Sequence, residues 1–118
     1  MVHKYYNSEG KVAVLVSLAY GTGWSSTAKD KIMKREMMMN KHLVEYVIKM
    51  RSTTKNPTPE GIERIWEKYL TNYPVPLLKG VKQLEILWME KHSVFQIRSM
   101  RGAEYIYQTC DDPCWVIA

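Results

Sequence analysis

The sequence predicts a single α+β domain over residues 1–118: an N-terminal strand, two or three helices, and then a C-terminal antiparallel β-meander. Three observations support this class. With 118 residues and 46% hydrophobic content, the chain can bury one core but hardly two. Apolar residues recur at helical spacing between residues 28 and 70, whereas short β-branched and aromatic runs separated by turn residues follow Val81. We therefore expect the helices to pack on one face of the sheet.

The first strand is predicted at residues 11–18. This segment is a short, continuous apolar run rich in β-branched residues and closed by glycine, which favours a buried strand over a helix. The preceding residues, "MVHKYYNSEG", are typical of an edge or turn segment, with "NSEG" as the turn.

A helical stretch is predicted from Ala28 to Met50, interrupted at Asn40, which can cap a second helix. Thr27 is the predicted cap of the first helix. The carboxylate of Asp30 then lies in the first turn, where the helix dipole favours a negative charge.

One face of this stretch is expected to point into the core, through Ile32, Met39, Leu43, Val47 and Met50. The three consecutive methionines at residues 37–39 cannot all point one way. We therefore expect at least one of them to be exposed or at an interface, although core filling is the favoured use of methionine here.

The next helix is predicted to begin at Thr58, which precedes Pro59 and Glu60, after the linker "RSTTKNPTPEG". Its apolar residues recur at i, i+3, i+4, i+7 and i+8, namely Ile62, Ile65, Trp66, Tyr69 and Leu70. Pro74 and Pro76 in "NYPVPLLKG" exclude a continuing helix.

Four short runs then predict hairpin-connected strands: "KQLEILWME", "SVFQIRSM", "AEYIYQT" and "CWVIA". Alternation places Leu84, Ile86 and Trp88 on one face of the first of these strands. It places Phe95 and Ile97 together on one face of the second.

The segment between the first strand and the first helix is the candidate ligand site. It is not a dinucleotide fingerprint, because Ser26 stands where the third glycine is needed, and the chain has no Gly-Lys-Ser or Gly-Lys-Thr of a P-loop. Glycines, hydroxyls, a cation and flat aromatic faces nevertheless suit an anionic, ring-bearing ligand, held by Tyr20, Gly21, Thr22, Gly23, Trp24, Ser25, Ser26, Thr27 and Lys29. The alternative is a corner of the fold in which Trp24 fills the core and Thr27 caps a helix.

The net charge of +5 is concentrated between residues 29 and 55, which hold eight basic and three acidic residues. Such a segment can bind nucleic acid by neutralising phosphates, and Lys31, Lys34 and Arg35 are the candidate contacts. It can equally be a solvated helix face.

We predict no catalytic residues, metal or cofactor. No histidine and acid are placed to activate Ser25 or Ser26, and Asp111 and Asp112 precede Pro113 in a predicted turn. Cys110 and Cys114 are expected to be reduced thiols, as is usual in a cytosolic protein. A zinc site is disfavoured, because His3, His42 and His92 do not stand at a recognised ligand spacing. The longest apolar run is too short to span a membrane, and no signal peptide is recognised, so we expect a cytoplasmic protein.

Several segments together resemble a group of small bacteriophage and prophage proteins: the strand followed by "YGTGWSS", then "NKHLVEYV", "LEILWMEKHSVFQIRSMRGAEYI" and the ending "WVIA". Members of that group carry a strand ending in Ser-Pro-Gly, a Gly-x-Gly-Trp-Ser loop and late Phe-x-Ile, Tyr-Asp-Gly and Trp-Ile-x-Ala patterns. The resemblance implies a small, non-enzymatic protein that interferes with host machinery, either by sequestering a nucleotide signal or by covering a host protein.

Two departures from this pattern concern the candidate site. Leu18 and Ala19 stand where the group has Pro-Gly, so the chain can bend differently before the loop. Residues 99–101 replace an acidic turn with Ser-Met-Arg before Gly102. If this turn lies near the glycine loop, Arg98 and Arg101 could contact the anion.

Three hypotheses follow: binding of a nucleotide-like anion, inhibition of a host protein through the methionine cluster or a sheet edge, and nucleic-acid binding through residues 29–55. A homodimer is also expected to be feasible, with Tyr105, Tyr107 and Trp115 either at its interface or in the core.

Overall fold

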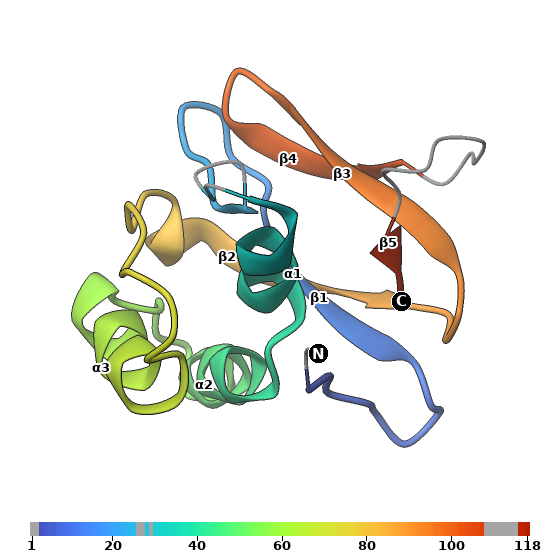
Figure 1. The fold of residues 1–118 in the computed structure, drawn as a ribbon, viewed down its shortest axis with the longest axis horizontal. Coiled ribbons are helices and arrows are strands. Elements are labelled where there is room, and N and C mark those ends of the chain that lie inside the picture. Colours follow the sequence, from blue (N-terminus) through green and yellow to red (C-terminus); the bar gives the residue numbers. More distant parts are fainter. Residues whose placement is uncertain (1–2, 26–27, 29, 108–115) are drawn as a thin grey trace.

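The computed structural model describes residues 3–25, 28, 30–107 and 116–118, and it confirms the α+β class. The chain follows the order shown in Figure 1: β1 (Val12–Ser17), α1 (Lys31–Met39), α2 (Lys41–Ser52), α3 (Pro59–Tyr69), the 3-10 turn η2 (Val81–Gln83), β2 (Leu84–Met89), β3 (Val94–Met100), β4 (Ala103–Tyr107) and β5 (Val116–Ile117).

The strands form two antiparallel sheets. β1 pairs with β2, so that Val12 lies opposite Met89, while β3 is the middle strand of the order β4-β3-β5. The hairpin from β3 to β4 is the predicted one. The predicted meander is otherwise rearranged, because β2 pairs with β1 and β5 returns to β3. β1 is wholly buried. The ladder with β2 satisfies the backbone polar groups on one edge, and on the other edge Ala13 N donates to the Tyr5 carbonyl and Ser17 N to the Glu104 carboxylate.

β1 is buried on both faces, which explains its continuous apolar sequence. Ala13 and Leu15 face a cluster that includes α2 and α3, whereas Val12, Val14 and Val16 face a cluster that includes β3 and β5. Figure 1 shows α2 and α3 on one side of the β1–β2 pair and the β3–β4–β5 sheet on the other. A strand between two apolar layers needs apolar side chains at every position.

α1 lies between the same two clusters. Met33 and Met37 pack in the helical cluster, and Met38 and Met39 in the sheet cluster. All three methionines of the triplet are therefore buried, and the prediction that at least one is exposed is wrong. A helix in contact with apolar groups on two sides buries a wider sector than an amphipathic surface helix does. Ile32 is the opposite case: it was expected in the core but is 60% exposed.

Capping side chains set where the helices begin. The Asp30 carboxylate accepts a hydrogen bond from Met33 N at 2.8 Å, so α1 begins at Lys31 rather than at the predicted Ala28. Thr27, the predicted cap, lies outside the described residues. The predicted caps of the other two helices are confirmed: Asn40 caps α2 and Thr58 caps α3.

α2 and α3 close the helical side of the core. Leu43 and Val47 of α2 are buried together with Ile62 and Trp66 of α3, as predicted. Tyr69, however, is an exposed residue of α3. The basic segment also has a structural function, because the Arg51 guanidinium donates to the Leu84 carbonyl at 2.7 Å and ties α2 to β2.

Candidate functional site

The glycine loop, residues 18–25, folds on itself directly after β1. The Thr22 hydroxyl donates to the Ala19 carbonyl at 2.6 Å and lies in hydrogen-bond contact with the Ser17 hydroxyl. The hydroxyl of Thr22, which was predicted to face a ligand, is thus engaged inside the loop.

The tip of the β3–β4 hairpin packs against this loop. Gly21 N donates to the Arg101 carbonyl at 2.7 Å, and Gly102, with φ +88°, lies against the backbone of Thr22. The turn that carries Arg101 therefore does lie beside the glycine loop, although the Arg101 side chain is exposed. Arg98 lies opposite Tyr105, one position from the Ser99–Glu104 pair, and hence on the other face of the hairpin. The structure does not bring Arg98 to the loop.

A second glycine contact holds the far side of the loop. Gly80, with φ +78°, lies so close to Gly23 that a Cβ at residue 80 would overlap the Gly23 carbonyl. Gly80 and Gly102, both with positive φ, thus pack against two consecutive residues of the loop, Gly23 and Thr22.

The last residues of the loop belong to the core. Trp24 is fully buried, and its indole Nε1 donates to the Met37 carbonyl at 3.0 Å. The expectation that Trp24 offers a face for ring stacking is therefore wrong. Tyr20 is 71% exposed and does not share a surface with that ring. Ser26, Thr27 and Lys29 lie outside the described residues.

A buried carboxylate completes this corner. Glu104 of β4 accepts hydrogen bonds from the Ser25 hydroxyl at 2.6 Å and from Ser17 N at 2.9 Å, and is 1% exposed. Glu104 was not among the predicted site residues. The alternation of β4 contained a signal for it, because Glu104 and the half-buried Ile106 are two residues apart and share the inward face. The hydrogen bonds of this carboxylate connect the glycine loop to the sheet.

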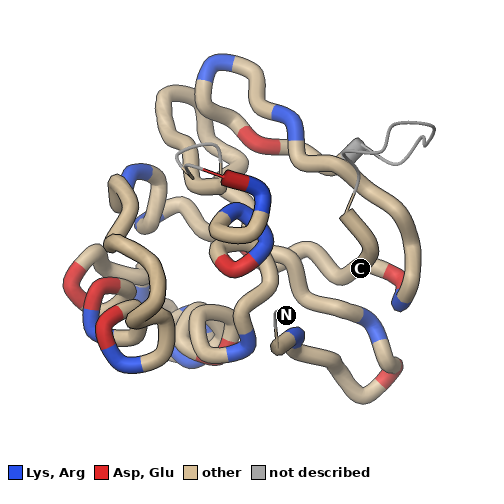
Figure 2. The backbone as a smooth tube through the Cα atoms, in the orientation of Figure 1, with Lys and Arg blue, Asp and Glu red and all other residues tan. Residues whose placement is uncertain are grey.

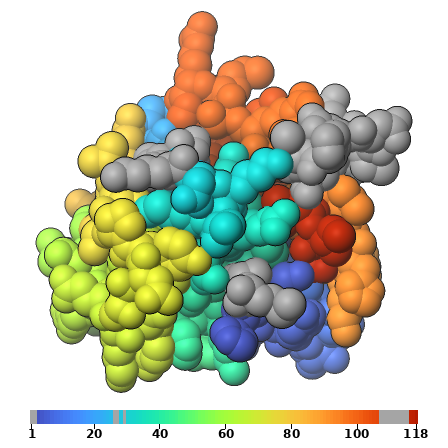
Figure 3. All heavy atoms as spheres, in the orientation of Figure 1, coloured from blue at the N-terminus to red at the C-terminus, as the bar shows by residue number. Residues whose placement is uncertain are grey.

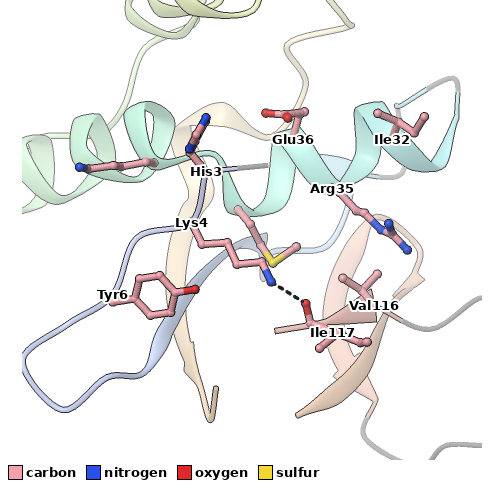
Figure 4. Close-up of a pocket in the computed structure, with 10 residues that line it drawn as sticks. His3, Lys4, Tyr6, Ile32, Arg35, Glu36, Val116 and Ile117 are labelled. Atoms are coloured by element: carbon pink, nitrogen blue, oxygen red, sulfur yellow. Dashed lines mark hydrogen bonds between the residues drawn. The ribbon is translucent and has the colours of Figure 1, made fainter. Parts of the chain in front are cut away.

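Two cavities lie elsewhere, among the residues that the structure describes. The larger one, which we call the cationic cleft, has a volume of about 710 Å³ and opens between the N-terminal segment, α1 and β5. It is lined by His3, Lys4, Tyr6, Ile32, Arg35, Glu36, Met39, Lys41, Val116 and Ile117 (Figure 4). In Figure 3 these three segments share one face of the molecule. Within the described part of the chain, no residue of the glycine loop lines this cleft.

Positive charge dominates the cleft. Figure 4 shows the Lys4 side chain crossing between α1 and β5, with its ammonium donating to the Ile117 carbonyl at 3.1 Å. Arg35 lies beside it on α1. Burial and, to a lesser degree, the Arg35 charge lower the pKa of Lys4 below the ordinary value of 10.5. Neither Lys4 nor Arg35 forms an ion pair with a described carboxylate.

The other charged groups of the cleft are already paired. The Glu36 carboxylate is buried and accepts from the Asn40 amide at 2.8 Å, so the residue that caps α2 also holds this acid in place. Lys41 lies 3.9 Å from Glu45 on the same helix. The charge available to a ligand therefore comes mainly from Lys4 and Arg35.

The floor of the cleft is apolar and accessible. Ile32 is 60% exposed and Ile117 56%, and the buried Met39 also lines the cleft. Tyr6 adds an aromatic ring that is nearly half exposed and has the Lys91 ammonium 5.5 Å from its centroid. Apolar side chains beside cations that have no described carboxylate partner suit a molecule with both a ring and an anionic group.

Of the predicted residues, Arg35 is the one that the structure places in this cleft. It was proposed as a nucleic-acid contact together with Lys31 and Lys34, which line a neighbouring cavity with it. Figure 2 shows basic positions along α1. Sequence reasoning missed His3, Lys4 and Tyr6, because their part in the cleft depends on how the N-terminal segment meets α1 and β5. The basic and aromatic residues of "HKYY" were the available signal.

Among the described residues, no three His, Cys, Asp or Glu side chains are grouped so that they could hold a metal ion. The helices in that part of the chain include none with the length and apolarity needed to cross a membrane. Cys110, Cys114, Asp111 and Asp112 lie outside the described residues. The cleft lining offers recognition groups, namely cations, an aromatic ring and apolar side chains.

Comparison with protein-family models, with curated proteins and with solved structures gave no match. The resemblance to phage proteins stays a prediction from motifs. Met37, Met38 and Met39 are buried, so the methionine cluster does not form the surface that was predicted to bind a host protein. A homodimer stays a prediction as well: Tyr105 is 37% exposed, Trp115 lies outside the described residues, and the structure does not describe the side chain of Tyr107.

Proposed function

We propose that the protein binds a small anionic molecule of the nucleotide type in the cationic cleft and releases it unchanged. The observation that carries this proposal is the placement of Lys4 and Arg35, two cations without a described carboxylate partner, above an apolar floor. A cleft of about 710 Å³ falls within the usual range of roughly 300–1,000 Å³ for small-molecule sites.

Each part of the ligand has a matching group in the cleft. The planar guanidinium of Arg35 can donate two parallel hydrogen bonds to a phosphate, and Lys4 adds a second positive charge. Ile32, Ile117 and Met39 offer apolar contact to a base or sugar, and Tyr6 offers an aromatic face. Glu36 disfavours a second anion at its own end of the cleft, which orients the ligand.

The glycine loop is not the site in this proposal. Its hydroxyls at Thr22 and Ser25 are bonded within the protein, and the Trp24 ring is covered. A ligand at the loop would have to break these contacts. The ligand class predicted from the sequence is kept, and its location moves to the other side of α1.

Isothermal titration calorimetry with a panel of mononucleotides and cyclic nucleotides tests the proposal. Binding should weaken about tenfold or more in Arg35→Gln and in Lys4→Met, because each variant removes a charge while keeping most of the side chain. Arg64→Gln, at an exposed position of α3, is the matched control and should bind like the unmodified protein. Mass spectrometry of the recovered nucleotide should show no product. Absence of heat and thermal shift with every nucleotide would overturn the proposal.

A second candidate function is binding of nucleic acid along α1. It is favoured by Lys31, Lys34 and Arg35, which lie at i, i+3 and i+4 of this helix and have no described carboxylate partner. This function predicts an affinity for all sequences alike that falls steeply with salt and is lost when the three residues are replaced together. A measured affinity for mononucleotides that exceeds the affinity per site on single strands would argue against it.

A further inference from the structure

A second cavity adjoins the cationic cleft along α1. It has a volume of about 110 Å³ and is lined by Lys31, Lys34, Arg35, Met38, Gln96, Ile97 and Val116. Arg35 and Val116 line both cavities, so the two cavities are neighbours. We call this second cavity the small cavity.

The two cavities differ in charge and in size. None of the residues described as lining the small cavity is acidic, whereas three are basic. Its volume of about 110 Å³ exceeds the roughly 10–15 Å³ that one water needs. It is less than a sixth of the volume of the cationic cleft, so it suits a small anionic group such as one phosphate better than a nucleoside.

The arrangement of the cations is that of two anion positions bridged by one arginine. Lys4 lies on the side of the cationic cleft, Lys31 and Lys34 lie on the side of the small cavity, and Arg35 is shared. An arginine has five N–H donors in a fixed plane, so different edges of the guanidinium can bind two anionic groups at once. The polar Gln96 amide adds a neutral donor to the small cavity.

We infer that the ligand is a nucleoside with two separate phosphate groups, one bound in the cationic cleft between Lys4 and Arg35 and the other in the small cavity between Arg35 and Lys34. This inference rests on the proposed function, because the nucleoside itself occupies the cleft. It adds a requirement for two phosphates at different ends of the molecule.

Three ligands separate this inference from simple charge attraction: adenosine 5′-monophosphate, adenosine 5′-diphosphate and adenosine 3′,5′-bisphosphate. The last two carry the same number of phosphates, but only the bisphosphate carries them apart. Calorimetry at constant ionic strength should show the bisphosphate binding about tenfold tighter than the diphosphate. Lys34→Met should remove that difference, because it removes the positive charge that the separate second phosphate contacts. Lys4→Met should weaken all three ligands, and Lys79→Met, at an exposed position outside both cavities, is the control.

Each outcome is decisive. Equal affinity for diphosphate and bisphosphate, or equal weakening of all three ligands by Lys34→Met, overturns the two-phosphate inference and leaves the proposed function intact. Failure of all three nucleotides to bind overturns both. Retention of the bisphosphate preference in Lys34→Met and in Lys31→Met would likewise show that the small cavity holds no phosphate.

Discussion

The glycine loop and the cationic cleft are the two polar regions on either side of α1, and they use their polar groups in opposite ways. In the loop, the hydroxyls of Thr22 and Ser25 are bonded to the protein itself. In the cleft, Lys4 and Arg35 have no described carboxylate partner and line open space. A cluster of glycines and hydroxyls can therefore be a structural corner, whereas cations that face a cleft without a described carboxylate partner indicate where a ligand could bind.

The largest effect on stability is expected from adding a side chain at a glycine that packs against the glycine loop. Gly102→Ala should lower the free energy of unfolding by about 4 kcal/mol, because a residue with positive φ costs about 1–2 kcal/mol and overlap with the Thr22 backbone about 1–3 more. Gly10→Ala is the matched control: its φ is +78°, but no atom lies within 4 Å of the added Cβ. Urea unfolding should give the control a loss of about 1–2 kcal/mol. Equal losses in the two variants would show that the loop is not held by this contact.

The next largest effect is expected at Glu104. Glu104→Ala should cost about 3 kcal/mol, because it leaves the Ser25 hydroxyl and Ser17 N buried without their acceptor and opens a cavity. Glu104→Gln keeps the shape and one acceptor oxygen, so its loss should be smaller, about 1–2 kcal/mol. Chemical unfolding of both variants measures the difference. If Glu104→Ala abolished nucleotide binding while the protein stayed as stable as before, the two regions would have to be one site.

The cleft should show its own pH dependence. In the free protein the pKa of Lys4 is lowered by burial and by Arg35, and a bound anion should raise it again because it favours the charged amine. Between these two pKa values binding takes up a proton, so the affinity should fall several-fold as the pH rises toward 10.5. Calorimetry across this range in two buffers of different ionisation enthalpy measures the proton uptake. Lys4→Met should remove it. The same uptake in that variant would assign it to another group.

The smallest effect is expected from Tyr20, the exposed aromatic residue of the loop. Tyr20→Ala should change stability by less than about 0.5 kcal/mol, as is usual for an exposed side chain, and should leave nucleotide affinity unchanged. Thermal unfolding and calorimetry test both statements. A loss of affinity like that of Arg35→Gln would return the ligand site to the glycine loop.

Local sequence signals predicted where helices and strands lie better than which of them pack or pair with one another. The caps at Asn40 and Thr58 and the buried strand after Lys11 were readable because each depends on residues close in the chain. The pairing of β1 with β2 could not be predicted in this way, because its partners, such as Val12 and Met89, are far apart in the sequence. The burial of all three methionines at residues 37–39 could not be predicted either, because a helical pattern does not show whether a second apolar layer covers the helix.

The same limit applies to the candidate site. The sequence drew attention to Arg35 through local charge density, but Lys4 and Ile117 come from opposite ends of the described chain and meet at a hydrogen bond across 113 residues. Composition suggested the ligand class for the glycine loop. It could not show that Glu104, 79 residues later, would bond to the Ser25 hydroxyl.

The separation of 87 residues between Ser17 and Glu104 has a consequence for synthesis of the protein in the cell. A chain emerges from the ribosome at about 5–20 residues per second, so β1 and the loop wait several seconds for the strand that completes their contacts. During that time β1 lacks both β2 and the sheet, and its five apolar residues are an aggregation hazard. Nascent chains halted before residue 84 should therefore depend on a chaperone that shields short apolar segments, and chains extended past residue 107 should not.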